Sequence, residues 1–169
     1  MPGRKPAPPL HPYKTAEAYR FRWFYVIESW IASGASVLDP EGVRLRLELD
    51  ASPQEIGEAV KTALDASRFM PRDSHSFAEL FRRALKATPD EDAARFLEMA
   101  PVRTRTSLYR DARNCGIRTQ GSRIIITPME KDGPGGWSGM RRVEDIDIPE
   151  AADAAEIGRA LLRGFELAR

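Results

Sequence analysis

The chain has 169 residues, which is enough for one domain with a sizeable core and too few for two ordinary domains. Its 26 basic and 25 acidic residues leave a formal charge of +1, which argues against a strongly cationic nucleic-acid coat protein and against an acidic mimic. A single cysteine argues against a disulfide framework, and with only two histidines the chain lacks the ligands of an ordinary zinc site. No apolar run approaches the ~20 residues that a membrane span needs, which argues against a transmembrane segment. We therefore expect one cytoplasmic domain with no membrane association, no metal and no cofactor.

The N-terminal region divides into a proline-rich arm and the start of a domain. Residues 1–12 hold five prolines and almost no apolar bulk, so they predict a flexible arm, and residues 13–169 form the single folded domain. From Tyr19 to Ile27 the chain is rich in aromatic and β-branched residues, which favours a strand, although a helix over 15–32 fits the same spacing. We assign these aromatic side chains to the core, because burial of large apolar groups is the default; a stacking platform for bases is the alternative.

The rest of the chain predicts strands and helices in turn. Strict alternation over 43–49 indicates a half-buried strand. Ser52 as N-cap, Pro53 at the first helical position and Glu55 in a capping box then begin a helix that runs to about residue 67. Further helical segments are predicted over 76–86, 88–99 and 104–113. The C-terminal part predicts strands over 116–119 and 123–127, a loop over 132–136, a strand over 144–148 and a last helix that begins at Asp153 and Glu156.

A strand–helix unit occurs twice. Shifting the chain by 101 residues aligns six identities among the 18 positions from Ala51 to Arg68, among them the string Glu-Ile-Gly-x-Ala. Gly57 and Gly158 fall in the same helical turn of the two copies. A helix-interior glycine costs about 1 kcal/mol against alanine, so the pair indicates close backbone approach, for which we expect a neighbouring sheet. The repeat predicts an α+β fold with antiparallel sheet, two quasi-repeated strand–helix units and extra helices.

Catalytic motifs are missing from the sequence. Neither histidine stands in a local motif with a carboxylate and a nucleophile, and there is no nucleophile-elbow, phosphate-loop or dinucleotide pattern. His75 lies among capping residues and reads as a helix start, Cys115 reads as a core residue, and the glycines of 133–136 read as a hairpin loop rather than a phosphate cradle. We expect no enzyme; a hydrolase built on His75 and Cys115 is the weakest hypothesis.

Charge is segregated along the second half of the chain. Residues 101–123 hold six arginines against Asp111, while residues 129–156 hold eight acidic residues against three basic ones. The two segments can pair with each other or remain solvated, or they can bind a phosphate backbone or a basic protein. A small nucleic-acid-binding domain that uses Arg103–Arg123 together with Tyr109 is therefore the alternative function.

Several short strings resemble a known family. Leu108-Tyr109, Cys115-x-Ile117, Ile124-Ile-Ile-Thr-Pro128, Gly136-Trp-Ser-Gly139 and Glu156-Ile-Gly-x-Ala-Leu161, in this order, are similar to the immunity proteins of bacterial contact-dependent growth inhibition (CDI) systems. The resemblance covers about residues 20–169, and the proline-rich arm and near-neutral charge depart from it. It implies a cytoplasmic, non-catalytic inhibitor that binds the C-terminal toxin domain of a surface effector. The partner is therefore a protein, and direct nucleic-acid binding by this chain is not expected. Such toxins are commonly nucleases.

The interface with such a toxin is predicted from charge alone. In the strand that ends at Ile148, alternation places Asp145 and Asp147 on the outer face. Glu144 and Glu150 flank them, and the glycine loop brings Asp132 and an exposed Trp137 nearby, a combination suited to a basic cleft. The alternative for this strand is ion pairing with the arginine segment. A second candidate is the helix start Asp90-Glu91-Asp92, where carboxylates also simply stabilise the helix dipole.

Overall fold

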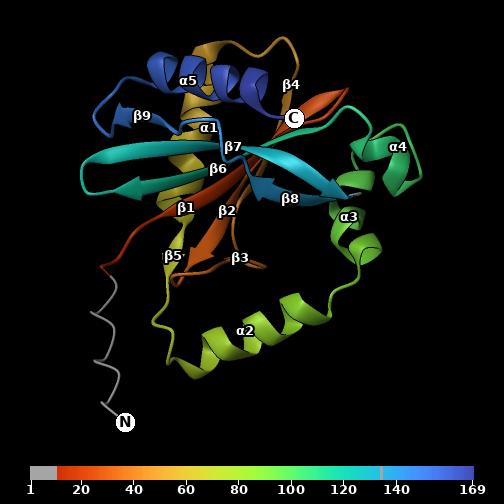
Figure 1. Cartoon of the computed structure of the whole chain (residues 1–169), viewed down its shortest axis with the longest axis vertical. Coiled ribbons are helices and arrows are strands. Elements are labelled where there is room, and N and C mark those ends of the chain that lie inside the picture. The colour runs from red at the N-terminus through yellow and green to blue at the C-terminus, as the bar shows by residue number, and fades with distance from the viewer. Residues whose placement is uncertain (1–10, 134) are drawn as a thin grey trace.

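The computed structural model describes residues 11–133 and 135–169 (Figure 1). Its strands are β1 (Thr15–Arg20), β2 (Phe24–Ala32), β3 (Ser36–Leu38), β4 (Arg44–Glu48), β5 (Arg68–Phe69), β6 (Arg113–Gln120), β7 (Arg123–Gly133), β8 (Gly136–Gly139) and β9 (Ile146–Pro149). Its helices are α1 (Pro53–Ala66), α2 (His75–Lys86), α3 (Pro89–Leu97), α4 (Arg105–Tyr109) and α5 (Ala154–Leu167). The predicted α+β class with an antiparallel sheet is confirmed, and only the short β5 pairs in parallel.

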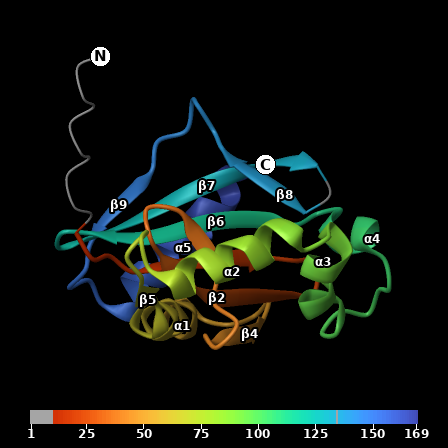
Figure 2. The same cartoon turned by 90° about the horizontal axis from the view of Figure 1, so that it is seen from below.

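Two layers build the main core. The strands run in the order β3-β2-β1-β6-β7-β8, with β4 beside β2 and β9 beside β7. Helices α1 and α5 pack against each other and against the same face of the central strands (Figures 1 and 2). On that face Ile27 and Ile126 meet Ile56 of α1 and Ile157 of α5, all nearly inaccessible to solvent. A second cluster, around Phe21, Phe24, Phe96 and Leu108, joins the opposite face to α3 and α4.

The predicted repeat is confirmed and extends beyond one strand and one helix. The hairpin β1–β2 is followed by β4 and α1, and the hairpin β6–β7 is followed by β9 and α5. In the first copy Leu45 of β4 lies opposite Ile27, and in the second Ile146 of β9 lies opposite Ile126. The strands β1 and β6 then pair antiparallel, which joins the two copies at the middle of one continuous sheet. The sheet is therefore quasi-symmetric about the β1–β6 pair.

The repeated glycines bring two helix backbones together. A Cβ atom on Gly57 would lie 1.6 Å from the carbonyl oxygen of Ala154, and one on Gly158 would lie 1.8 Å from that of Pro53. Close backbone approach was the prediction, and this part is confirmed. The expected neighbour was wrong: it is the other copy's helix rather than a sheet, because α1 and α5 lie side by side over the strands.

Some predicted boundaries were wrong for identifiable reasons. The region 19–27 is strand and not helix, as expected, but it belongs to two strands rather than one. β1 ends at Arg20 and β2 begins at Phe24, and the turn between them contains no glycine or proline. The loop expected over 132–136 is the tip of a hairpin, because β7 continues to Gly133 and pairs with β8. Gly133 and Gly135 allow this turn through φ values of 144° and 84°. Most of the predicted arm, residues 1–10, lies outside the described residues.

Candidate functional site

Asp147 of β9 and Asp145, which directly precedes this strand, lie where the alternation predicts, on the sheet face opposite α1 and α5. Asp147 Oδ1 is 2.7 Å from Arg123 Nε, and Asp145 Oδ2 is 3.4 Å from Arg118 Nη2. Ion pairing with the arginine segment, the alternative considered for this strand, is therefore present. Both carboxylates remain about half exposed, with side-chain exposures of 54% for Asp147 and 39% for Asp145. Their exposed neighbours Glu144 and Glu150 complete an acidic edge.

Trp137 is not the exposed anchor that the sequence predicts. Its ring packs edge-on against Tyr109, with centroids 6.4 Å apart, and it belongs to the second hydrophobic cluster. The indole is half-buried, and its Nε1 atom is buried without a hydrogen-bond partner among the described residues. The reason is the pairing of β8 with β7, which draws the side chain inward. Asp132, in the same hairpin, is exposed.

The carboxylates at the start of α3 serve the helix itself. Glu91 accepts a hydrogen bond from the backbone N–H of Thr88 at 2.7 Å and so completes a capping box. Asp92 lies 2.5 Å from Arg95, and Asp90 lies 3.6 Å from Arg105. The helix-stabilising role considered for these residues is thus satisfied by local contacts.

The residues of the hydrolase hypothesis lie in different environments. Cys115 is fully buried against Gly164 of α5, and burial raises the pKa of its thiol. His75 is exposed at the first position of α2, whose N-cap is Ser74, as the reading of a helix start predicts. Within residues 11–133 and 135–169, no group of three or more His, Cys, Asp or Glu side chains is placed to hold a metal ion. In the same ranges no helix is long and apolar enough to cross a membrane.

The arginines of residues 103–123 do not form one basic surface. Arg118 and Arg123 pair with β9, and Arg105 approaches Asp90. Arg113 donates to the backbone carbonyl of Ala168. These side chains spread over α4, β6 and β7, so the contacts favour ion pairing within the molecule over a phosphate-binding stripe.

A row of polar residues crosses the sheet face that carries Asp145. The strand registers place Arg44 beside Glu28, Glu28 beside Glu17, Glu17 beside Gly116 and Gly116 beside Thr127. Arg118 donates to Thr127 Oγ1 at 3.1 Å and pairs with Asp145, so Asp145 continues the row. We call this set the polar row: Arg44, Glu28, Glu17, Gly116, Thr127 and Asp145. A sheet face lined by charge in this way is unusual for a structural surface, because buried charges are costly unless they are paired.

Glu28 is the most buried member of the polar row and is fully paired. Its side chain is 1% exposed, and both of its oxygens accept from Arg95, at 2.9 and 3.2 Å. Arg44 adds a third contact at 2.9 Å. The pairing anchors α3 to β2, because Arg95 is a residue of α3 and Glu28 of β2.

Glu17, at the centre of the row, has a different environment. Its Oε2 atom accepts a hydrogen bond from Asn114 Nδ2 at 2.8 Å, and within the described chain it forms no ion pair. Burial raises the pKa of this carboxyl to about 8, with the nearby charge of Glu28 adding to the effect and Asn114 and Arg95 opposing it. At neutral pH the folded protein therefore favours a protonated Glu17.

This shift predicts the pH dependence of stability. The folded state retains a proton on Glu17 that the unfolded chain releases, so stability falls as pH rises from about 4.5 to about 8. We expect Glu17→Gln, which cannot ionise, to remove this fall and to stabilise the protein by about 1–3 kcal/mol at pH 9. Urea denaturation from pH 4 to pH 9 measures the effect. A variant less stable than the wild type at pH 9 would contradict it.

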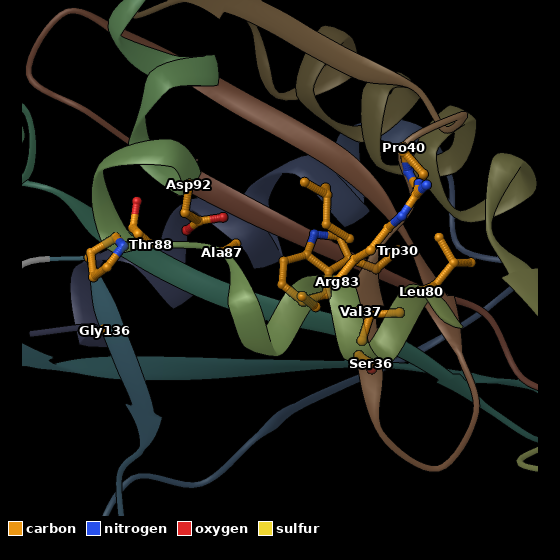
Figure 3. Close-up of a pocket in the computed structure, with 14 residues that line it drawn as sticks. Trp30, Ser36, Val37, Pro40, Leu80, Arg83, Ala87, Thr88, Asp92 and Gly136 are labelled. Carbon is orange, nitrogen blue, oxygen red and sulfur yellow. The ribbon is translucent and has the colours of Figure 1, made fainter. Parts of the chain in front are cut away.

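A cleft of about 540 Å³ lies beside the polar row, between α2, the start of α3, β3 and the β7–β8 hairpin (Figure 3). Trp30 and Arg83 line it from β2 and α2, and Asp92 lines it from α3. Elsewhere on α2, Phe81 and Leu85 are 37% and 71% exposed.

Comparison with known proteins identifies the family. The CdiI family model, described as CDI immunity protein, matches residues 14–168. The chain belongs to this family. Among individual relatives, the immunity protein CdiI-YPIII of Yersinia pseudotuberculosis serotype O:3 (strain YPIII) is 24% identical over 151 residues, which is 82% of this chain and 85% of the relative.

Two solved structures share the fold of this CDI immunity protein. A protein of unknown function from Neisseria meningitidis, NMB0488, superposes with a TM-score of 0.81 at 21% identity, over 94% of this chain and 96% of its own. The CdiA-CT/CdiI toxin and immunity complex from Yersinia pseudotuberculosis matches with a TM-score of 0.79 at 19% identity, over 94% and 99%. These matches confirm the α+β fold that the repeat predicts.

The sequence did not single out the polar row of this CDI immunity protein. Glu17 and Glu28 come from one hairpin, and Gly116 and Thr127 from the other, so only the β1–β6 pairing brings them together. One local signal was available: Glu17 stands between Ala16 and Ala18, whose small side chains face the helices, so alternation turns the carboxylate to the other face.

Proposed function

We propose that this CDI immunity protein acts in the cytoplasm as a non-enzymatic inhibitor that binds and neutralises the C-terminal toxin domain of a CDI effector, and that this toxin is a nuclease. The observation that carries the proposal is the family match over residues 14–168. The related Yersinia structure, whose description is a toxin and immunity complex, supports a toxin domain as the partner. A nuclease suits the acidic edge of β9, because the substrate cleft of a nuclease is basic and attracts carboxylates.

We place the toxin on the sheet face that carries the polar row and on its acidic edge, formed by Glu144, Asp145, Asp147 and Glu150. Surface ion pairs contribute only about 0–1 kcal/mol, so Asp145 and Asp147 can exchange their arginine partners for basic groups of the toxin at little cost. The start of α3 lines the neighbouring cleft through Asp92, and Asp132 is exposed near the end of β7, so we add both to the proposed contact surface. Trp137 is left out of the interface, since its half-buried ring packs against Tyr109 and the second cluster.

A growth assay tests the function. The toxin domain of the effector encoded beside this chain is induced in a sensitive bacterial host, with and without this chain. We expect growth to stop with toxin alone and to recover with the immunity protein, and purified toxin to lose RNA or DNA cleavage when the chain is added at equal concentration. His75→Ala should protect as well as the wild type, because no chemical role is assigned to it. No rescue and no complex would contradict the proposal.

Reversing charge on the acidic edge tests the proposed surface. We expect Asp145→Lys with Asp147→Lys to slow toxin association about tenfold at low salt and to leave the fold intact, because exposed charges mainly steer association. The effect should shrink at high salt, where the Debye length falls to about 3 Å at 1 M. Surface plasmon resonance measures the rate. Glu58→Lys with Glu166→Lys, on the exposed sides of α1 and α5, makes the same charge change away from the surface. Equal rates for both pairs would place the interface elsewhere.

A further inference from the structure

The centre of the polar row is asymmetric although the fold around it is repeated. Glu17 and Gly116 are direct partners in the β1–β6 pairing, at the point where the two copies of the repeat meet. One copy places a carboxylate there, and the other places no side chain at all. The symmetric fold therefore presents a carboxylate and an empty position next to each other.

Gly116 leaves a notch in the sheet face. Among the described residues, a Cβ atom at this position would meet only Glu17 Oε1, at 3.6 Å, which is ordinary van der Waals contact. The glycine is therefore not required by crowding, and its φ lies outside the left-handed region that favours glycine. Glycine inside a strand weakens it and often marks a place where a ligand or another chain approaches closely. Thr127, the neighbour of Gly116 on β7, is half-buried and lines the other side of the notch.

Glu17 supplies the chemistry of the notch. The other carboxylates of the polar row have basic partners: Glu28 has Arg44 and Arg95, and Asp145 has Arg118. Glu17 has only the neutral amide of Asn114 among the described residues. It is half-buried, so its ionised form is costly unless a cation lies beside it. A group that enters the notch beside it gains most if it brings a positive charge and hydrogen-bond donors.

We propose that the notch over Gly116 receives a basic side chain, lysine or arginine, of the toxin domain, which pairs with the carboxylate of Glu17. This inference rests on the proposed function and adds to it one central contact. A lysine or arginine side chain can reach into the sheet face from a partner, and its charge favours the ionised form of the one carboxyl of the row that lacks an ion pair within the described chain. The peripheral acidic edge then steers association, while Glu17 holds the bound partner.

The test compares two substitutions that alter the notch in different ways. Glu17→Gln keeps the shape and removes the carboxyl that can ionise beside a bound cation, and Gly116→Val fills the notch with a side chain that a strand accommodates. We expect each to raise the dissociation constant for the purified toxin domain about 10- to 100-fold, mainly through faster dissociation. Glu166→Gln, an exposed carboxylate on α5, should leave it unchanged.

Folding and binding separate in this experiment. Glu17→Gln is expected to unfold at a higher urea concentration than the wild type at pH 8 and above, so weaker binding by this variant is not a stability defect. If the wild-type chain binds the toxin and protects, and Glu17→Gln and Gly116→Val both bind it as tightly as the wild type, the proposed contact in the notch is overturned and the proposed function stands. A wild-type chain that does not bind the toxin would overturn the proposed function itself.

Discussion

Gly57→Ala and Gly158→Ala are each expected to lower the free energy of unfolding by about 3 kcal/mol or more, the upper part of the range for overpacking. The reason is geometric: the added Cβ would lie 1.6 Å from a backbone oxygen of α5 in one case and 1.8 Å from one of α1 in the other. A backbone atom inside a helix cannot move aside as the end of a side chain can. The two helices must separate, and the core between them and the sheet loosens. Urea denaturation followed by far-ultraviolet circular dichroism measures the loss.

Gly139→Ala is the matched control for these variants. No atom lies within 4 Å of a Cβ at this position, at the exposed end of β8, so this variant should unfold close to the wild type. Unchanged midpoints for Gly57→Ala and Gly158→Ala would mean that the helices do not approach as closely as the repeat requires. The two substitutions should also combine with less than additive cost, because they open the same helix contact.

Local chemistry made much of the fold predictable from sequence. Ser52, Thr88 and Asp153 each accept a hydrogen bond from the third residue of the helix they begin, so the helix starts follow from neighbouring residues alone. The turn between β1 and β2 carries no such residue, and the short strands β3 and β5 exist only because β2 is available to pair with them. Elements of this kind depend on the finished sheet and leave little trace in the sequence.

In the candidate site, too, some features follow from nearby residues and others depend on the finished sheet. Segregated charge left pairing between the arginine segment and the acidic segment as one of several alternatives, and the structure shows that pairing at Arg118 and Arg123, because opposite charges on neighbouring strands attract. The exposure of Trp137 could not be read from its neighbours, since it depends on the pairing of β8 with β7. Glu17 and Gly116 lie far apart in the chain, and their contact depends on how the two copies of the repeat join.

The ion pair between Arg95 and Glu28 should be the most important polar contact for stability. We expect Arg95→Ala to cost about 3–5 kcal/mol, because it leaves a buried carboxylate without its main partner. Arg95 also lies over the ring of Phe96, with the guanidinium carbon 4.2 Å from the ring centroid, so the truncation removes packing as well. Arg44→Ala should cost much less, since the Arg44 side chain is 35% exposed and that of Arg95 only 10%.

A double variant separates the charge from the packing. Adding Glu28→Gln to Arg95→Ala removes the stranded charge, so it should recover part of the lost stability. Urea denaturation of both variants at pH 8 measures this recovery. A loss of only about 1 kcal/mol for Arg95→Ala at pH 8 would lie in the range typical of exposed ion pairs. Solvent and Arg44 would then be enough to compensate Glu28, and the pair with Arg95 would not anchor α3 to the sheet.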